Sequence, residues 1–182
     1  KFERVNVNPF SLVDLNSEEW LCYPANVGEL VILIYFHKKF LELGMSLCNL
    51  FKLAEDEDLQ RKPDAVYLFG VPGNALDDLA PTPTVFYDDA ENGMMVAAAP
   101  NRDEFGYFGY LKKMVLTIHN IQMMKAKKFP FHGALIRIIL KGNREATILF
   151  IGDTGAGKSE TLEAFRELGH ELIQDLIIVA DD

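Results

Sequence analysis

A glycine-rich stretch near the end of the chain restricts its fold more than any other feature. It follows an apolar run, Thr147–Ile151, and precedes SETLEAFREL, which has the composition of a helix. Glycine weakens helices and strands by about 0.5–1 kcal/mol relative to alanine. A cluster of glycines between two regular elements therefore needs a reason other than stability. The pattern predicts a strand, a glycine-rich loop and a helix over residues 147–168.

The loop itself reads GDTGAGKS and matches the phosphate-binding pattern G-x-x-x-x-G-K-[ST], the Walker A motif or P-loop. Glycines allow consecutive backbone N–H groups to turn toward one anion, which a Cβ atom would hinder. Lys158 brings a mobile positive charge to the β- and γ-phosphates, and Ser159 supplies a hydroxyl group to Mg²⁺. The helix that follows directs its partly positive N-terminus at the same phosphates. We therefore expect ATP to bind here together with Mg²⁺.

The predicted nucleotide-binding set comprises the loop and the residue after it: Gly152, Asp153, Thr154, Gly155, Ala156, Gly157, Lys158, Ser159 and Glu160. Glu160 opens the helix, and its side chain is expected to meet solvent or a structural partner. Loops of this kind occur in GTPases, ATPases and several kinds of kinase. The loop alone therefore does not identify the reaction.

Composition disfavours several classes of partner and location. The 182 residues are 49% hydrophobic, which suits one globular domain or two small ones. The formal net charge of −9 disfavours nucleic acids and anionic membrane surfaces. No apolar run reaches the roughly 18 residues of a transmembrane helix, and no signal peptide is visible. Cys22 and Cys48 fit a reducing compartment as small buried residues. We expect a cytoplasmic protein, and the sequence leaves open whether it forms a homo-oligomer.

The N-terminal part of the chain predicts strands and helices in alternation. Glu29–Phe36 and Asp64–Asn74 are rich in β-branched and aromatic residues, as buried strands are. Between them, apolar residues recur every three or four positions from Phe40 to Ala54 and predict an amphipathic helix. Thr84–Pro100 holds two apolar runs around a turn and predicts a hairpin.

A second helix is expected after Asp103, which offers an N-cap. The basic run Lys125–Lys128 suits the C-terminus of this helix, and Pro130 stops it. We place the boundary between two parts of the chain beside this proline. Residues 1–128 form an α/β region of unknown role, and residues 129–182 form a nucleotide-binding segment.

Four features of this segment follow one another in an order that is known from one family. They are His132-Gly133 on a strand that leads by a hairpin into the loop, the continuation Ser159-Glu160-Thr161, then Gly169-His170, and finally Asp181-Asp182. In this order they resemble the catalytic domain of bacterial HPr kinase/phosphorylase and, more distantly, phosphoenolpyruvate carboxykinase. The resemblance implies an α/β fold with a mixed-sheet P-loop segment. A domain of this family continues beyond the aspartate pair, so we expect this chain to be truncated or the front part of a larger protein.

The resemblance also implies roles for individual residues. Lys158 would hold phosphate, Ser159 would bind Mg²⁺, and His132 would face the phosphates. In the carboxykinase branch the similarly placed histidine is a metal ligand. An aspartate after the next strand would accept the proton of the phosphorylated hydroxyl, which suits a reaction that depends on positioning and charge neutralisation. The residue pattern alone is also compatible with His132 as a strand-edge histidine without a role.

Two positions compete for the functional aspartate. The family spacing after Gly-His places Asp175 at the first aspartate and Leu176 at the second, whereas Asp181-Asp182 follows the apolar run LIIVA six residues later. We favour the pair because an apolar strand that ends in acidic residues is typical of a Walker-B-like metal site. This strand is expected to be buried beside TILFI, with Asp175 on a turn outside the sheet. Asp175 as the functional residue, or a solvated chain end, are the alternatives.

Three functions are compatible with these features. The first is an ATP-dependent kinase that transfers the γ-phosphoryl group to a hydroxyl such as that of a protein serine. GDTGAGKSET favours it, because this loop is closer to HPr kinase than to the G-x-x-G-T-G-K-T of carboxykinases. The second is a carboxykinase-like enzyme acting on a small carboxylate metabolite, and the third is a non-catalytic nucleotide-binding module or sensor. The expected catalytic residues are Lys158, Asp182 and His132, and the expected metal ligands are Ser159 and Asp181.

Overall fold

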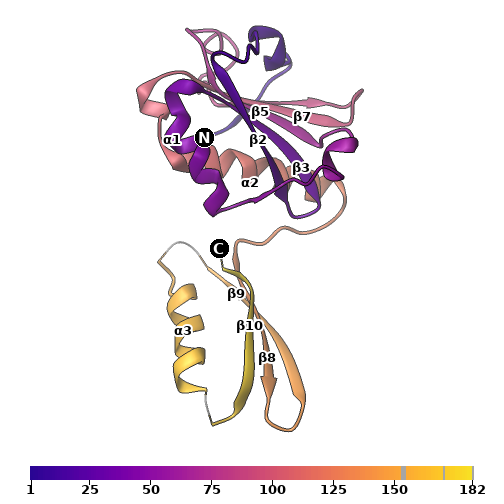
Figure 1. Cartoon of the computed structure of the whole chain (residues 1–182), viewed down its shortest axis with the longest axis vertical. Helices are drawn as coiled ribbons and strands as arrows, with labels where there is room; N and C mark the ends of the chain where they lie inside the picture. Colours follow the sequence, from indigo (N-terminus) through magenta and orange to yellow (C-terminus); the bar gives the residue numbers. More distant parts are fainter. Residues whose placement is uncertain (153–154, 170, 182) are drawn as a thin grey trace. The chain divides into compact units, whose positions relative to one another are not determined.

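The computed structural model describes residues 1–152, 155–169 and 171–181. It contains two compact units, Lys1–Lys128 and Phe129–Asp182, both shown in Figure 1. Both units combine strands with helices, so the predicted α/β class is confirmed. Within the described ranges, no helix combines the length and the apolar character that a membrane span requires.

The N-terminal unit is built on a mixed sheet of seven strands in the order β1-β6-β7-β5-β3-β2-β4. Strands β3, β5 and β7 are parallel neighbours, whereas the β2–β3 and β6–β7 pairs are antiparallel. The strands are β1 (Glu3–Arg4), β2 (Trp20–Val27), β3 (Leu30–His37), β4 (Lys52–Leu53), β5 (Ala65–Val71), β6 (Val85–Asp89) and β7 (Met94–Pro100). The two predicted strands and the predicted hairpin of this region are therefore confirmed.

Hydrophobic cores lie on both faces of this sheet. Strand β5 is buried along its whole length, and its successive side chains point to opposite faces. Tyr67 belongs to a core that includes Ile118 of helix α2 (Phe108–Lys125). Val66 belongs to a second core, which includes Leu76 from the loop after β5. The parallel strands are thus covered on both sides, as parallel sheets generally are.

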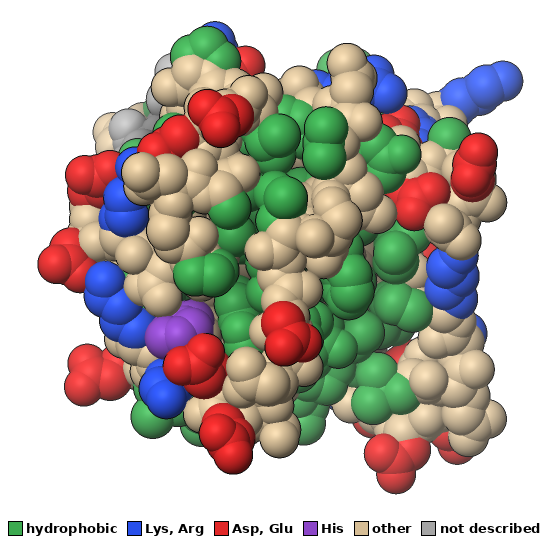
Figure 2. Space-filling model, turned by 90° about the horizontal axis from the view of Figure 1, so that it is seen from above, with side chains coloured by type: hydrophobic (Ala, Val, Ile, Leu, Met, Phe, Trp, Pro, Cys, Tyr) green, Lys and Arg blue, Asp and Glu red, His purple; other side chains and the backbone are tan. Residues whose placement is uncertain are grey.

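Charged side chains lie mainly at the surface. Figure 2 shows one face of the molecule, on which hydrophobic side chains gather in the middle and acidic and basic ones are scattered around them. Ion pairs such as Lys52–Glu55, at 2.6 Å, join side chains that are mostly in contact with solvent. Exposed pairs of this kind contribute about 0–1 kcal/mol each. The cores on the two faces of the sheet, and not the ion pairs, therefore hold the N-terminal unit together.

The predicted helix Phe40–Ala54 is wrong in its length and continuity. The chain there forms three short helices in succession: the 3₁₀ helix η2 (Lys38–Phe40), the α-helix α1 (Leu41–Met45) and the 3₁₀ helix η3 (Ser46–Asn49). Gly44 packs directly against the ring of Phe36, which anchors α1 to the sheet. Lys52–Leu53 then pairs with β2 as an edge strand. Pairing with the sheet thus ends the helical stretch that the apolar spacing predicts.

The prediction that Asp103 caps the second helix is also wrong. Asp103 begins a separate 3₁₀ helix, η5 (Asp103–Phe105), and Tyr107 is the N-cap residue of α2. The N–H group of Gly106 donates to the Asp103 carbonyl oxygen at 2.9 Å and closes that short turn. Asp103 therefore belongs to η5 and not to the start of α2, where the sequence predicts it.

The two cysteines are exposed and not buried as the sequence predicts. The thiol of Cys22 is nevertheless partly desolvated. This desolvation raises the pKa of the Cys22 thiol to about 11, and a hydrogen bond with Tyr35 offsets part of the rise. Cys22 therefore stays protonated at neutral pH.

The C-terminal unit is a three-stranded sheet with one helix packed against it (Figure 1). Its elements are β8 (Gly133–Leu140), β9 (Arg144–Ile151), α3 (Lys158–Leu168) and β10 (Ile173–Asp181). Leu162 of α3 is buried together with Ala134, Ile136 and Ile138 of β8. The predicted hairpin and the predicted strand, loop and helix are confirmed. The mixed sheet belongs to the N-terminal unit, however, and the described sheet that carries the loop is antiparallel.

The last strand has a different neighbour from the one that the sequence predicts. The sheet order is β10-β8-β9, so β10 lies beside β8 and not beside TILFI of β9. The carbonyl oxygen of Leu172 accepts a hydrogen bond of 2.9 Å from the N–H group of Lys141, so the chain re-enters the sheet beside the end of β8. Ile177 and Val179 are 41% and 57% exposed, which contradicts the predicted burial. Asp175 lies within β10 and not on a turn.

Gly44→Ala is expected to destabilise the protein, although alanine is the better helix former. A Cβ atom at residue 44 would lie 2.4 Å from the ring of Phe36, which is only 2% exposed. Overpacking of this kind costs about 1–3 kcal/mol, against a gain in helix propensity of about 1 kcal/mol. Urea denaturation followed by Trp20 fluorescence measures the free energy of unfolding. Leu41→Ala in the same helix is the exposed control, and a Gly44→Ala variant as stable as wild type would contradict the packing argument.

Candidate functional site

The glycine-rich loop joins the end of β9 to the start of α3. Gly155 and Gly157 have φ angles of 82° and 85°, in the left-handed region that favours glycine. Gly157 is also the N-cap residue of α3, so its conformation turns the chain into the helix. A Cβ atom at either position would meet no atom of the described residues within 4 Å. Backbone conformation, and not lack of space, therefore requires these two glycines.

Gly152 is required for a different reason, which is close packing inside the loop. A Cβ atom here would lie 2.8 Å from the Cβ atom of Ala156. The Nζ atom of Lys158 donates a hydrogen bond of 2.9 Å to the carbonyl oxygen of Gly152. This contact joins the first residue of α3 to the first residue of the loop. The contact thus brings the cationic group of Lys158 back to the start of the loop.

Thr161 fixes the first turn of α3 to the loop, a role that the sequence does not single out. Its hydroxyl group donates a hydrogen bond of 2.6 Å to the carbonyl oxygen of Gly157, which also accepts the Thr161 backbone N–H at 2.9 Å. The sequence signal for this contact is a threonine four residues after the glycine that starts the helix. Helical threonines commonly donate a hydrogen bond to the carbonyl oxygen of the residue four positions earlier. The glycine cap itself has no side chain, and helix starts of this type are typical anion-binding sites.

The register of the sheet brings predicted residues to one edge. Gly133 pairs with Ile151, so His132 and Gly152 leave the sheet side by side. The backbone of Asp181 reaches the same edge on the other side of β8. Neighbouring strands lie about 4.8 Å apart, so Asp181 is about 10 Å from β9 in the plane of the sheet. It is thus one strand further from the loop than the sequence predicts.

Some predicted residues cannot be placed in this site. Asp153, Thr154, His170 and Asp182 lie outside the described residues, and the side chain of Asp181 is not described either. Glu160 is exposed, as the sequence predicts.

The alternative aspartate lies far from the loop. Asp175 pairs with Ile139, close to the hairpin turn that joins β8 and β9. Ile139 follows Gly133 by six residues, which corresponds to about 20 Å of strand. The structure therefore does not bring Asp175 to the edge where the loop begins.

The described part of the chain contains no group of three or more His, Cys, Asp or Glu side chains that could hold a metal ion. Magnesium at a phosphate site does not need such a group. It typically takes one or two protein ligands and completes its coordination with phosphate oxygens and water. Ser159 lies in the first turn of α3, and β10 ends at Asp181 on the side of β8 away from the loop strand.

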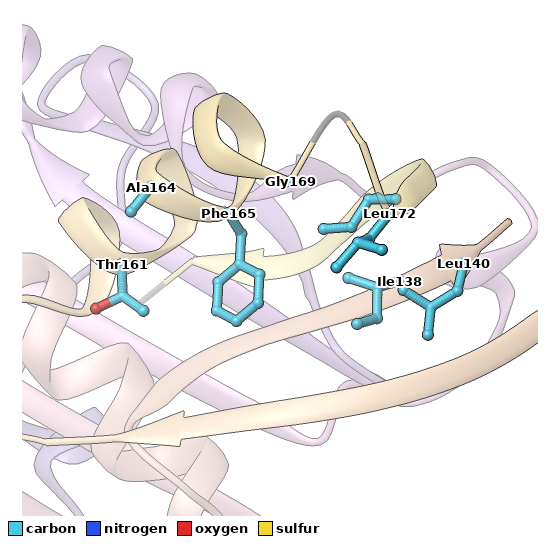
Figure 3. Close-up of a pocket in the computed structure, with 8 residues that line it drawn as sticks. Ile138, Leu140, Thr161, Ala164, Phe165, Gly169 and Leu172 are labelled. Carbon is cyan, nitrogen blue, oxygen red and sulfur yellow. The ribbon is translucent and has the colours of Figure 1, made fainter.

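A hollow of about 350 Å³ lies between α3 and the sheet. Figure 3 shows Phe165 pointing from α3 toward the strands, with Ile138, Leu140 and Leu172 lining the hollow further along. Among the described residues that line it, Thr161 supplies the one polar side chain. Ligand sites combine apolar walls with several placed polar groups. We therefore assign no catalytic role to this hollow.

The N-terminal unit has a hollow of about 540 Å³ beside η2 and η5. Its two lysines, Lys38 and Lys39, are balanced by Glu42 and Asp103 in the same lining. Lys39 and Asp103 form an ion pair of 2.7 Å, and the hydrogen bond from Lys39 lowers the pKa of the Asp103 carboxyl. The charges that line this hollow therefore balance, so it offers no net charge to a ligand.

Comparison with known protein families, curated proteins and solved structures finds no match to this chain. A functional assignment therefore depends on the loop, on the residues around it and on the resemblance of their sequence.

Gly157→Ala is expected to loosen the start of α3. With φ at 85°, a residue other than glycine is strained by about 1–2 kcal/mol. The amide hydrogens of α3 should then exchange about 5–30 times faster, as this free energy implies. Hydrogen exchange measured by mass spectrometry checks this.

Gly157→Asn is the matched control, because asparagine adopts left-handed conformations more readily than alanine. Its α3 amides should exchange at rates between those of wild type and Gly157→Ala. Equal rates in all three proteins would contradict the conformation assigned to Gly157.

Proposed function

We propose that the chain is a phosphotransferase that binds ATP and Mg²⁺ at Gly152–Ser159 and transfers the γ-phosphoryl group to a protein serine. One observation carries the binding step. A loop with the phosphate-binding pattern joins a strand to a helix through two left-handed glycines, and Lys158 reaches across it. The hydroxyl acceptor is supported by the resemblance to HPr kinase alone.

In this proposal Lys158 changes its partner when the nucleotide binds. Its ammonium group is bonded to the neutral carbonyl oxygen of Gly152. A phosphate oxygen is a stronger acceptor for it, because the phosphate carries a negative charge that attracts the ammonium group and the carbonyl oxygen carries none. The Thr161 contact to Gly157 holds the helix start in place during this exchange.

The remaining roles in this proposal belong to residues near the edge of the sheet where the loop begins. Ser159 and an aspartate at the end of β10 would hold Mg²⁺, which when bound supplies charge neutralisation at the phosphates. His132, beside Gly152 in the register, would face the phosphates. Asp182 would accept the proton of the serine hydroxyl as it is phosphorylated.

Lys158→Ala is expected to weaken ATP binding by about 2–4 kcal/mol, the range for loss of one partner of a desolvated charge pair. Isothermal titration calorimetry with ATP and Mg²⁺ measures this. Lys141→Ala is the matched control, because Lys141 lies at the hairpin turn, at the opposite end of the same sheet. If wild type and Lys158→Ala bind ATP equally, the loop is not the binding site.

In the full-length protein, Asp182→Ala is expected to abolish phosphoryl transfer while ATP affinity stays within about tenfold, or 1.4 kcal/mol. Loss of the base removes the proton acceptor but not the phosphate contacts. Transfer is measured by mass spectrometry of HPr, the acceptor that the resemblance implies, after incubation with ATP. Asp175→Ala is the control and should transfer normally, because Asp175 lies near the far end of β8.

A reversed outcome, with Asp175→Ala inactive and Asp182→Ala active, would contradict the assignment of the base. A full-length wild-type protein that binds ATP but phosphorylates no acceptor would contradict the phosphotransferase proposal and leave a nucleotide-binding module.

A further inference from the structure

Two phenylalanines lie exposed at the start of the C-terminal unit. Phe129 is 78% exposed and Phe131 is 56% exposed, and Phe129 is the most exposed of the large hydrophobic side chains in the described ranges. Their ring centroids are 5.1 Å apart with an interplanar angle of 52°. Single exposed apolar side chains are common, but grouped aromatic surface of this kind typically marks a binding site. The fold of the unit alone does not account for this pair.

The pair lies next to the glycine-rich loop in the sheet topology. Phe131 precedes His132, which stands beside Gly152 at the edge of the sheet. Two residues of chain span at most about 7 Å, so Phe131 stays within that distance of Gly133, the first residue of β8. The aromatic pair and the loop therefore belong to one unit and to one edge of its sheet.

The chain between the two rings is stiff. Pro130 has its own φ fixed near about −65° by its ring. It also restricts the residue before it, Phe129, to extended conformations. Little conformational freedom is then lost when a ligand settles on the rings, which favours binding.

The chemistry of the pair fits a flat aromatic ligand. Aromatic side chains bind nucleic acid bases by stacking, because every base has a π-face. Phenylalanine has no hydrogen-bonding group, so it cannot distinguish adenine from guanine. A nucleotide whose phosphates lie in the loop carries such a base, joined to them by its ribose.

We infer that Phe129 and Phe131 form the stacking surface for the purine base of the nucleotide that the loop binds; this inference rests on the proposed function. The loop binds the charged phosphates of the nucleotide, and the aromatic pair binds its uncharged base. ATP and GTP are bound alike at this surface.

The test compares ATP with tripolyphosphate, which has the phosphates without the base. Calorimetric titrations with both ligands and Mg²⁺ are made on wild type, Phe131→Ala and the double variant Phe129→Ala/Phe131→Ala. Stacking contributes about fivefold to 150-fold per base. The double variant should therefore lose ATP and GTP affinity within that range while its tripolyphosphate affinity stays unchanged.

Two further variants separate stacking from a structural role. Phe131→Trp keeps an aromatic face and should retain ATP affinity. Tyr107→Ala removes an aromatic side chain that is 66% exposed in the N-terminal unit, and it should change neither titration.

Each outcome of these titrations either supports or contradicts the stacking surface. Equal losses for ATP and tripolyphosphate would show that the pair supports the loop and does not contact the base. Unchanged ATP affinity in the double variant would also overturn the stacking surface, while the loop would stand. If wild type binds neither ligand, the proposed function fails and the stacking surface fails with it.

Discussion

The pairing of strand β8 on both of its sides is the constraint on which the C-terminal unit depends. Ile136 of β8 packs with Leu162 of α3 in the core, so the register of this strand decides which residues are buried. A shift by one residue would turn the buried side chains to solvent. Gly133 adds a local restriction, because a Cβ atom there would lie 2.2 Å from the carbonyl oxygen of Phe150. The pairing that buries the core thus also determines which residues stand beside the loop.

The two ends of this sheet differ in chemistry as a result. At one end lie the glycine-rich loop, His132 and the exposed phenylalanine pair. At the other end lie the hairpin turn and Asp175, and the apolar hollow extends beneath α3 from Thr161 to Leu172. Lys158 reaches back to Gly152 instead of extending into solvent. A lysine that is already held gives up less side-chain freedom when it changes partner, and that freedom amounts to about 1.5–2 kcal/mol for a long side chain.

Local sequence patterns predicted the parts of this fold that depend on local chemistry. The strand, loop and helix at 147–168 follow from glycine spacing beside apolar runs, and the hairpins follow from turn residues between such runs. The errors arise where distant contacts decide. Gly44 against Phe36 and the pairing of Lys52–Leu53 with β2 break a helix that its apolar spacing predicts. The apolar run in β10 reads as a buried central strand, yet β10 is an edge strand.

The candidate site was likewise predictable from the sequence only in part. The loop pattern places Lys158 and Ser159 at a helix start, because strand, glycines and helix are contiguous in sequence. The distance of the aspartates from the loop was not predictable, because it depends on which side of β8 the last strand joins. The phenylalanine pair gave no sequence signal either, since FPF looks like any apolar stretch until its exposure is known.

The small core of the C-terminal unit links its stability to whatever the loop binds. Among the described residues of this unit, four make up its buried core, whereas the N-terminal unit has a core on each face of its sheet. Units of this size bury a smaller share of their surface than larger domains do and are correspondingly marginal in stability. A ligand that binds only the folded form adds about 2.7 kcal/mol at a hundred times its Kd. Because α3 both begins at the loop and supplies Leu162 to the core, a nucleotide bound under the proposed function would strengthen the helix–sheet packing directly. The N-terminal unit, whose cores contain none of these residues, would gain nothing comparable from the same contacts.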